Sequence, residues 1–458
     1  MGDKGMDLRA RVVLACFALA LSALTARLFY LQIVQHRHLA QMAQRQQERT
    51  VEIQPARGNI YDRCGRPLAF NRECFSYFAV PSEIQNPVQT ARALAPWVGV
   101  SAVVLERKFK TSREFVWLRR KVTDAAAAGL EALRLPGVHR LSESRRVYPE
   151  GALACHVLGF VGVDNQGLDG VELQFERLIH GTAGWMRIAR DAQGRTVLTS
   201  TRTLKAPESG QDVVLTIDKV VQHTAERELA QVIEKYKAVS GSVLVMDPHT
   251  GEILALANWP QFDPNRFWQF SGEARRNRAV RDMYEPGSTF KIFTAAAALE
   301  EGVFKEADMF NCEQGNAVFG SRVVRDHIPH GLLSFKDVIS FSSNIGAVKI
   351  GQRLGAERLV RYAHGFGFGR ATGVELPGEA SGLLKPAGRW NAATMASVPY
   401  GQEVAVTTLQ TAAAYAAVAN DGWLPQPTLI KEIRGADNRV TQLESPEVRQ
   451  QAVSPETA

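Results

Sequence analysis

Cysteine is scarce in this sequence, and its five cysteines are isolated: Cys16, Cys64, Cys74, Cys155 and Cys312. None forms a C-x-x-C pair, and no group of histidines and cysteines has the spacing of metal ligands, so the sequence predicts no metal site. Cys64 and Cys74 are close enough in sequence to pair in an oxidising compartment. We prefer the interpretation that they are small apolar side chains.

The sequence also lacks a basic stripe with interleaved aromatic residues, which argues against a nucleic-acid partner. It has no internal repeat and no low-complexity segment. The net charge of +7 is modest for 458 residues, and a solvated surface explains it as well as an anionic lipid or polymer partner does. Apolar residues make up 45% of the chain and charged residues 22%, which is typical of a globular protein. The length predicts two or three domains.

One long apolar stretch lies near the N-terminus. Residues 12–26 carry no charge, and after Arg27 the apolar character continues to Val34, so the stretch is long enough to span a bilayer. We expect the N-terminus to stay in the cytoplasm and the remaining chain to lie outside, because three basic residues precede the stretch, Lys4, Arg9 and Arg11. A cleaved signal peptide is the alternative, but no small-x-small cleavage site follows the uncharged core.

The pattern after the anchor predicts two exported regions. Residues 1–11 form a cytoplasmic tail and 12–34 the transmembrane anchor. Residues 35–235 start with a helical stalk over 35–49 and continue with mixed structure. That structure includes strands at 75–80 and 212–217 and a helix at 220–236 capped by Asp218. Residues 236–458 form a second domain with a sharper pattern.

The pattern of the second domain predicts strands followed by helices. Residues 242–246 and 252–257 are strand-like and flank the turn sequence D-P-H-T-G, which predicts a β-hairpin. Alanine-rich helices are expected at 288–301, 345–354 and 407–420. This order argues for an α+β or α/β domain with helices packed on a sheet.

The sequence S-T-F-K at residues 288–291 opens the first of these helices and carries chemistry. At i and i+3 the Ser288 hydroxyl and the Lys291 amine share one helix face, so a neutral lysine can take the serine proton. The helix N-terminus favours negative charge at the serine. The simpler interpretation is that Ser288 is an ordinary helix cap and Lys291 a solvated residue.

A second polar cluster, Ser342-Ser343-Asn344, precedes another helix. Ser342 can relay a proton between the lysine and a leaving amine, and the Asn344 amide can hold a substrate backbone or brace the lysine. Taken alone, this cluster is also explained as a helix cap. However, S-x-x-K and S-x-N each occur once, in the order and at about the separation found in penicillin-recognising serine enzymes.

The sequence around these motifs resembles the class B penicillin-binding proteins. Four blocks in the second half carry the resemblance, at residues 247–255, 285–291, 341–346 and 400–402 with 406–410. Four more agree in the first half, at residues 57–63, 65–69, 146–149 and 167–172. Within the family the chain is most similar to division-type or sporulation-type members such as FtsI, with the elongation type as the main rival.

The resemblance implies an α+β fold with a single transmembrane helix and an elongated, non-catalytic dimerisation or pedestal domain. The transpeptidase domain that follows has a five-stranded antiparallel sheet with helices on both sides. The family's third motif, K-[ST]-G, is absent from this sequence, and A-T-G at 371–373 lacks the lysine. We therefore expect a polypeptide truncated before this motif. It would lack one oxyanion-hole donor and a lysine that lowers the pKa of Lys291, and could be inactive.

The function implied by the resemblance is that of a serine-type D-Ala-D-Ala transpeptidase that cross-links peptidoglycan stem peptides during septal wall synthesis. Ser288 would be the nucleophile, Lys291 its base and Ser342 the proton relay, with Asn344 as the fourth catalytic residue. β-Lactams would acylate the same serine, and no cofactor is needed. Substrate contacts are expected from four further residues, Ser343, Tyr400, Gly401 and Gln402.

The implied surroundings are a single-pass protein of the inner (plasma) membrane with its catalytic domain on the periplasmic side. Arg57, Asp62 and the non-catalytic domain would position the enzyme. The expected partners are the bilayer, a membrane-embedded glycan polymerase of the shape-and-division type and other divisome proteins. Three alternatives stay open: an elongation-type transpeptidase, a catalytically dead divisome scaffold, and a β-lactamase or β-lactam sensor.

Overall fold

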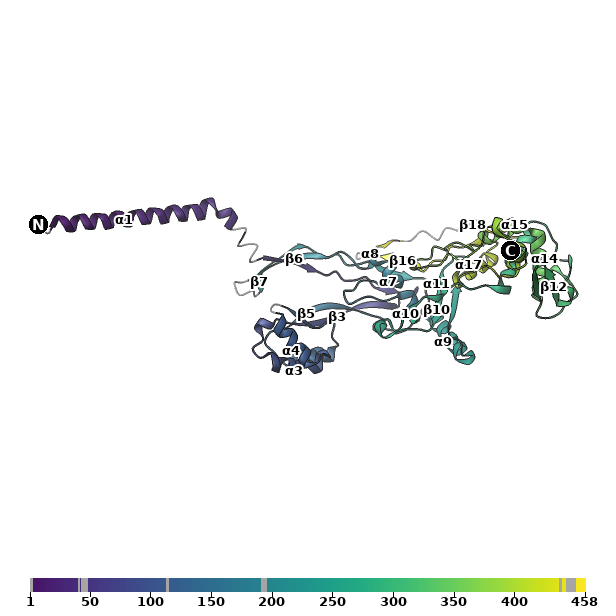
Figure 1. Ribbon diagram of the computed structural model, residues 1–458, viewed down its shortest axis with the longest axis horizontal. Helices are drawn as coiled ribbons and strands as arrows, with labels where there is room; N and C mark the ends of the chain where they lie inside the picture. Colours follow the sequence, from purple (N-terminus) through teal and green to yellow (C-terminus); the bar gives the residue numbers. More distant parts are fainter. Residues whose placement is uncertain are drawn as a thin grey trace. The chain divides into compact units, whose positions relative to one another are not determined.

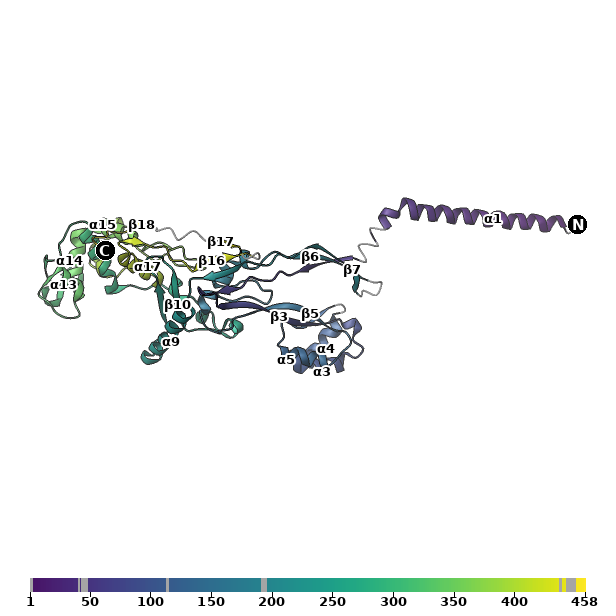
Figure 2. The same cartoon turned by 180° about the vertical axis from the view of Figure 1, so that it is seen from behind.

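A computed structural model describes residues 3–39, 42, 48–112, 115–190, 196–435, 439–441 and 450–458 (Figures 1 and 2). The chain divides into two compact units. The first consists of Met1–Pro55 and Thr182–Glu208, and the second of Ala56–Gly181 and Ser209–Ala458.

The first unit begins with a long helix, α1 (Asp3–Phe29), which continues into a π-helical turn, η1 (Tyr30–Val34). Within it, the 23 residues Val12–Val34 have a mean hydropathy of 2.1, and none of the most apolar window is buried. By length and composition this stretch can cross a membrane, and it coincides with the predicted anchor. The Arg27 guanidinium lies 5.7 Å from the centre of the Tyr30 ring, a cation–π contact within the stretch.

The same unit holds a three-stranded antiparallel sheet in the order β1 (Glu48–Ile53), β6 (Gly184–Arg190), β7 (Thr196–Lys205). The predicted helical stalk at 35–49 is wrong at its end: Glu48 and Arg49 are in β1, because their backbones pair with Ala189 and Ile188. Residues 36–39 and 42 are helical. The other residues of the predicted stalk at 40, 41 and 43–47 lie outside the described residues.

The second unit contains a seven-stranded sheet built from segments that are far apart in sequence. The order is β17 (Val440–Thr441), β16 (Ile430–Arg434), β8 (Asp212–Leu215), β2 (Ile60–Tyr61), β3 (Pro67–Ala79), β4 (Val116–Arg119), with β5 (Val138–Val147) also on β3. β3 and β5 pair antiparallel over ten residues of each strand, from Phe70↔Val147 to Ala79↔Val138. The strands predicted at 75–80 and 212–217 are present, but each ends one or two residues early.

Three helices pack beside β3 and β5, as both views show (Figures 1 and 2): α3 (Pro87–Val98), α4 (Ala102–Thr111) and α5 (Asp124–Ala132). Each starts at a side chain that accepts a backbone N–H, namely Asn86, Ser101 and Thr123, which is how helix N-termini are usually satisfied. Their apolar faces join β3 and β4 in one buried cluster that includes Tyr77, Leu94, Leu105 and Leu130.

A buried ion network lies where the loop before β2 meets the short helices α6 (Cys155–Leu158), α7 (Gly170–Gln174) and α8 (Glu176–Ile179). The Glu172 carboxylate accepts hydrogen bonds from Arg57 Nε at 2.7 Å, Arg146 Nε at 2.6 Å and the Tyr148 hydroxyl at 3.2 Å. The side chains of Arg57, Arg146 and Glu172 are at most 2% exposed. Burial raises the pKa of Glu172, but the two guanidinium groups lower it overall.

Asp62 also holds segments of the second unit together, from the turn between β2 and β3. Its carboxylate is fully buried and accepts the backbone N–H groups of Cys64, Arg66 and Lys219. Arg57 and Asp62, which were expected to position the enzyme, thus hold together segments of the second unit that are distant in sequence.

The second half of the chain starts with α9 (Lys219–Tyr236), capped by the predicted Asp218, followed by the predicted hairpin of β9 (Gly241–Met246) and β10 (Ile253–Trp259). Val243 and Val245 of β9 pack towards α9. Leu244 and Met246 pack against the cluster that contains Leu409 of α17 (Thr408–Ala419). Because alternate residues of a strand point to opposite faces, the hairpin has helices on both sides, as predicted.

The predicted five-stranded sheet is not formed by the described residues. There β9 and β10 pair in a two-stranded sheet, with one isolated bridge from Glu252 to Thr428. The strand that follows soon after Thr428, β16, pairs with β8 instead. One buried cluster also joins Ile60 and Leu215 to Leu256 and Leu409, which explains why the segments on either side of residue 235 form one compact unit. The domain boundary at 235 stays a prediction.

The remaining helices and strands of this half follow in short segments. They are η3 (Pro264–Gln269), α10 (Gly272–Arg275), α11 (Arg278–Arg281), η4 (Gly287–Phe290), α12 (Lys291–Glu300), β11 (Met309–Asn311), η5 (Glu313–Gly315), β12 (Asn316–Phe319), β13 (Arg322–Arg325), β14 (Leu332–Ser334), α13 (Phe335–Ser340), α14 (Asn344–Leu354), α15 (Ala356–Gly365), η6 (Ala387–Arg389), α16 (Ala392–Met395), η7 (Val398–Tyr400), β15 (Trp423–Leu424) and β18 (Gln450–Gln451). One further short helix in the first half is η2 (Pro81–Glu83).

All five cysteines are unpaired in the structure. Cys64 is exposed and Cys74 is buried, in keeping with the interpretation of Cys74 as a small apolar side chain. Burial raises the pKa of the Cys74 thiol, so it is less reactive than an ordinary cysteine.

The buried network predicts a large penalty when its acid is neutralised. Glu172→Gln leaves two guanidinium groups without their shared carboxylate, so we expect a loss of about 3–5 kcal/mol in the free energy of unfolding. Urea unfolding of the detergent-solubilised protein, followed by tryptophan fluorescence, measures it. Glu228→Gln is the control: its pair with Arg227 is about half exposed, and should contribute less than about 1 kcal/mol. Equal losses in both variants would contradict the prediction.

Candidate active site

The first motif lies on a turn that leads directly into a helix. Ser288 is exposed and sits in η4, and Lys291 is the first residue of α12, so the predicted helix begins with a tighter turn. The Thr289 hydroxyl donates to the Pro286 carbonyl at 2.8 Å, which closes this turn. The Ser288 hydroxyl makes no hydrogen bond to any of the described residues, so it is free to react.

Lys291 is buried, although it is a lysine on a helix. Its side chain is nearly inaccessible, and its Nζ donates to the Ser342 carbonyl at 2.5 Å and to the Ser342 hydroxyl at 3.0 Å. Burial lowers the pKa of Lys291 to about 8, while the negative charge of Asp326 acts in the opposite direction. A pKa of about 8 leaves roughly a tenth of the amine neutral at pH 7, which is enough for a base.

The second motif forms the turn before α14. Ser342 is exposed and has a positive φ of 58°, which is unusual for a residue with a side chain. The Asn344 side-chain amide donates to the Arg325 carbonyl at 2.8 Å. It is therefore held by the β13 end and does not brace Lys291 in this conformation.

Ser343, predicted to contact substrate, is fully buried. Its hydroxyl donates to the Asp326 carboxylate at 2.6 Å and accepts the Gly346 N–H at 3.0 Å. It is therefore the N-cap of α14 and faces away from the open side of the site.

The Tyr400–Gln402 segment lies directly beside the serine turn. The Gly287 N–H donates to the Gly401 carbonyl at 3.0 Å. Gly401 has a φ of 81°, and a Cβ there would meet the Gly287 carbonyl oxygen at 2.1 Å, so only glycine fits. Tyr400 is nearly buried in a cluster with Ile345 and Val348 of α14, and Gln402 accepts from Arg322 at 3.1 Å.

The structure thus brings the three motif segments together. Lys291 touches Ser342, and Gly287 touches Gly401, although these pairs are 51 and 114 residues apart in sequence. An exposed hydroxyl three residues before a buried amine, with a second hydroxyl on that amine, is suited to acyl transfer through a serine ester.

Two residues of this region carried no sequence signal. Asp326 contacts the S-x-N turn through both carboxylate oxygens, and Glu403 is held by Lys385 at 2.8 Å and Arg322 at 3.2 Å. Neither lies in a recognisable motif. Nothing in the sequence around Asp326 indicated its contact with the S-x-N turn, because only folding brings this residue to the start of α14.

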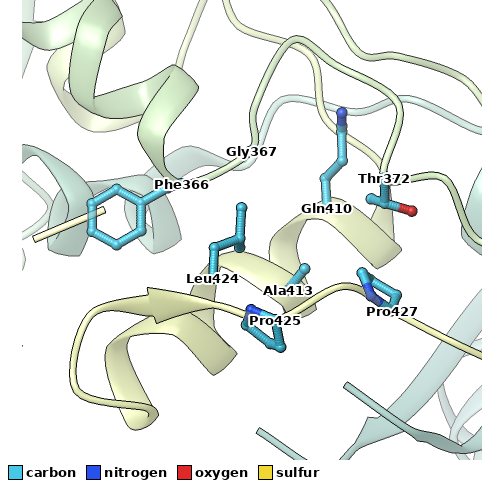
Figure 3. A pocket seen from close by; sticks show the side chains of 8 residues that line it. All are labelled: Phe366, Gly367, Thr372, Gln410, Ala413, Leu424, Pro425 and Pro427. Carbon is cyan, nitrogen blue, oxygen red and sulfur yellow. The ribbon is translucent and has the colours of Figure 1, made fainter. Parts of the chain in front are cut away.

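A separate pocket lies between α17 and the loop after β15 (Figure 3). It is lined by Phe366, Gly367, Thr372, Gln410, Ala413, Leu424, Pro425 and Pro427. Its cavity of about 10 Å³ is at the limit for one water molecule. It is too small for a substrate and contains none of the motif residues.

Two family models match the chain. Residues 52–215 match the penicillin-binding protein dimerisation domain, and residues 241–458 match the penicillin-binding protein transpeptidase domain.

The chain is similar to two curated proteins over most of its length. It is 37% identical to stage V sporulation protein D of Bacillus subtilis, over 94% of this chain and 68% of that protein. It is 32% identical to the peptidoglycan D,D-transpeptidase FtsI of Escherichia coli, over 90% of this chain and 71% of that protein.

Among solved structures, penicillin-binding protein 3 of Mycobacterium tuberculosis in complex with aztreonam superposes with a TM-score of 0.67. It is 28% identical and covers 89% of this chain and 73% of that one. The similarity extends over both halves of the chain.

Gly401 offers a direct test of the contact between the segments. In Gly401→Ala the new Cβ must displace the Gly287 carbonyl and adopt a left-handed backbone, so we expect a loss of roughly 1–3 kcal/mol in stability. Gly272→Ala is the control, because a Cβ there meets nothing within 4 Å, and its effect should stay within about 0.5 kcal/mol. Urea midpoints measure both, and a stable Gly401→Ala would show that the close approach is not required.

Proposed function

Since this chain belongs to the class B penicillin-binding proteins, we propose that it is a peptidoglycan D,D-transpeptidase that works through a serine ester. The observation that carries the proposal is the buried Lys291 amine on the Ser342 hydroxyl, with an exposed Ser288 three residues before the lysine. All three residues lie within the part of the chain that matches the transpeptidase domain.

In the proposed reaction the neutral Lys291 amine takes the proton of the Ser288 hydroxyl. The Ser288 oxygen attacks the carbonyl of the penultimate D-Ala of a stem peptide, and the bond to the terminal D-Ala breaks. Ser342, in hydrogen-bond contact with the lysinium, relays the proton to the departing amine. An amine of a neighbouring stem peptide then attacks the ester, which forms the cross-link and frees Ser288.

The remaining motif residues would shape the cleft. Asn344 sits on the first turn of α14 and is half-buried, and we propose that its amide contacts the substrate peptide. Gly401 contacts the serine turn, and Tyr400 packs against α14. We propose that substrate lies along this segment and that a β-lactam acylates Ser288 in the same place.

The apolar helix and the relatives fit a single-pass membrane protein. We propose that the N-terminus is cytoplasmic and that the catalytic half faces the cell wall, because basic residues precede the span, Lys4, Arg9 and Arg11. We also propose the inner membrane as its location and a membrane-embedded glycan polymerase as its partner. A role in division is supported by the relative named FtsI.

Labelling with fluorescent penicillin tests the nucleophile. The protein isolated from its own membranes should become covalently labelled, and Ser288→Ala should lose the label because the ester oxygen is gone. Ser271→Ala is the matched control: Ser271 is also an exposed serine, caps α10 and is remote from Lys291 in sequence. Gel fluorescence reads the result.

The other outcomes of the labelling experiment identify the alternative functions. A folded protein that takes no label is a scaffold, and label retained in Ser288→Ala moves the nucleophile elsewhere. Rapid turnover of penicillin by the wild-type protein, without a lasting label, would indicate a β-lactamase.

The lysine predicts a pH dependence of labelling. Protonated Lys291 cannot accept the serine proton, so the rate should rise with pH around a midpoint near its pKa of about 8. Rates of acylation measured from pH 6 to 9 give that midpoint. Lys291→Arg, which stays charged throughout, should remain folded and acylate at least roughly 10²-fold more slowly. A flat profile in the wild type would exclude Lys291 as the base.

A further inference from the structure

Both oxygens of the Asp326 carboxylate bind the S-x-N turn and the residue after it. One oxygen accepts the backbone N–H of Asn344 at 2.6 Å and of Ile345 at 3.0 Å. The other accepts the Ser343 hydroxyl at 2.6 Å. The loop that carries it is fixed in turn, because the Asp326 N–H donates to the Gly315 carbonyl at 3.0 Å.

These contacts satisfy the start of α14, an 11-residue helix. The first N–H groups of a helix have no partner within the helix. Here Asp326 takes those of Asn344 and Ile345, and Ser343 takes that of Gly346. A carboxylate is well placed there, because the helix dipole favours negative charge at the N-terminus.

The consequence reaches Ser342, which immediately precedes the capped turn. Its positive φ of 58° is a strained conformation that persists only where neighbouring contacts determine it. On one side, the Ser342 and Ser343 N–H groups donate to Ile339 and Val338. On the other side, the segment is fixed by Asp326. This conformation directs both the carbonyl and the hydroxyl of Ser342 at Lys291.

The same loop also holds the Asn344 side chain. Its amide donates to the carbonyl of Arg325, the residue before Asp326. Residues 325 and 326 therefore fix both the backbone and the side chain of Asn344, and two of the four proposed catalytic residues depend on them.

We propose that Asp326 is a positioning residue for the transfer reaction, which sets the turn that presents Ser342 to Lys291 and fixes the backbone of Asn344. It is not a catalytic residue, since its oxygens are taken up by Ser343, Asn344 and Ile345. This inference rests on the proposed function for its activity readout. Its charge has a second effect: among the described residues it is the charged group that acts on the pKa of Lys291, and it raises that pKa against burial.

Two variants separate position from charge. Asp326→Ala removes all three hydrogen bonds, and we expect acylation by fluorescent penicillin to slow by about 10²-fold, as for a misplaced catalytic group. Asp326→Asn keeps an oxygen for the two amides, and the Ser343 hydroxyl can turn towards Cys312 Sγ, 3.3 Å away. This variant should keep most of the rate at high pH, with the midpoint of its pH profile moved to lower pH because a negative charge near Lys291 is lost.

Asp337→Asn is the matched control. Asp337 lies in the first turn of the neighbouring helix α13, is also half-buried and also binds a serine hydroxyl, that of Ser334 at 2.6 Å. A general effect of neutralising a carboxylate at a helix N-terminus would appear here too. We expect its rate and its pH midpoint to equal those of the wild type.

The outcomes separate this inference from the proposed function. If the wild type acylates and a folded Asp326→Ala acylates equally fast, the inference is wrong. If the wild type takes no label, the proposed function fails, and hydrogen exchange then decides the inference. In that case Asp326→Ala should strongly reduce the protection of the Asn344 and Ile345 amides while Asp337→Asn leaves it unchanged. Unchanged protection in Asp326→Ala would overturn the inference.

Discussion

The catalytic half of this protein depends on one buried amine. Lys291 Nζ is almost inaccessible to water and is held by a carbonyl and a hydroxyl of the same residue, Ser342. Neither of these partners carries a charge. The amine is therefore desolvated without being paired to an adjacent carboxylate, which is the situation that lowers the pKa of a lysine. An adjacent carboxylate would instead hold the proton on the lysine and raise its pKa.

The fold creates these uncharged surroundings of Lys291 by bringing together loops that are far apart in sequence. α12 carries the amine, the turn before α14 carries its partner, and the segment after η7 closes the serine turn through Gly401. Tyr400 packs on α14 and the Thr294 hydroxyl of α12 donates to the Pro399 carbonyl at 2.9 Å. Each of the three segments thus contacts the other two, and displacing one changes the surroundings of Lys291.

Local sequence predicted the parts of the structure that local physics determines. The hairpin of β9 and β10, the Asp218 cap and the helices α9, α14 and α17 were all predicted within a few residues. The turn residues, caps and apolar residues that determine each of these elements lie within a few residues of each other. The S-x-x-K motif was recognised for the same reason, since the i and i+3 spacing of Ser288 and Lys291 is itself the signal; its catalytic role stays a prediction.

Contacts between distant segments were not predictable in this way. β16 pairs with β8, more than two hundred residues earlier, and nothing in either strand specifies that choice. The same holds for Glu172 between Arg57 and Arg146 and for Asp326 at the start of α14. The cap that Ser343 provides for α14 was not predicted either, because a serine in a motif gives no indication of whether its hydroxyl is exposed or caps the next helix; its substrate contact stays a prediction.

The two halves use buried charge in opposite ways, and the difference follows from what surrounds each group. Glu172 is met by two guanidinium groups and stays charged, so its network stabilises one arrangement of loops. Lys291 is met by uncharged oxygen atoms, with Asp326 acting on it while hydrogen-bonded to the neighbouring turn. That separation lets one carboxylate fix the geometry around the amine while leaving its proton exchangeable near neutral pH. A carboxylate in direct contact would fix the geometry equally well but would keep the lysine protonated.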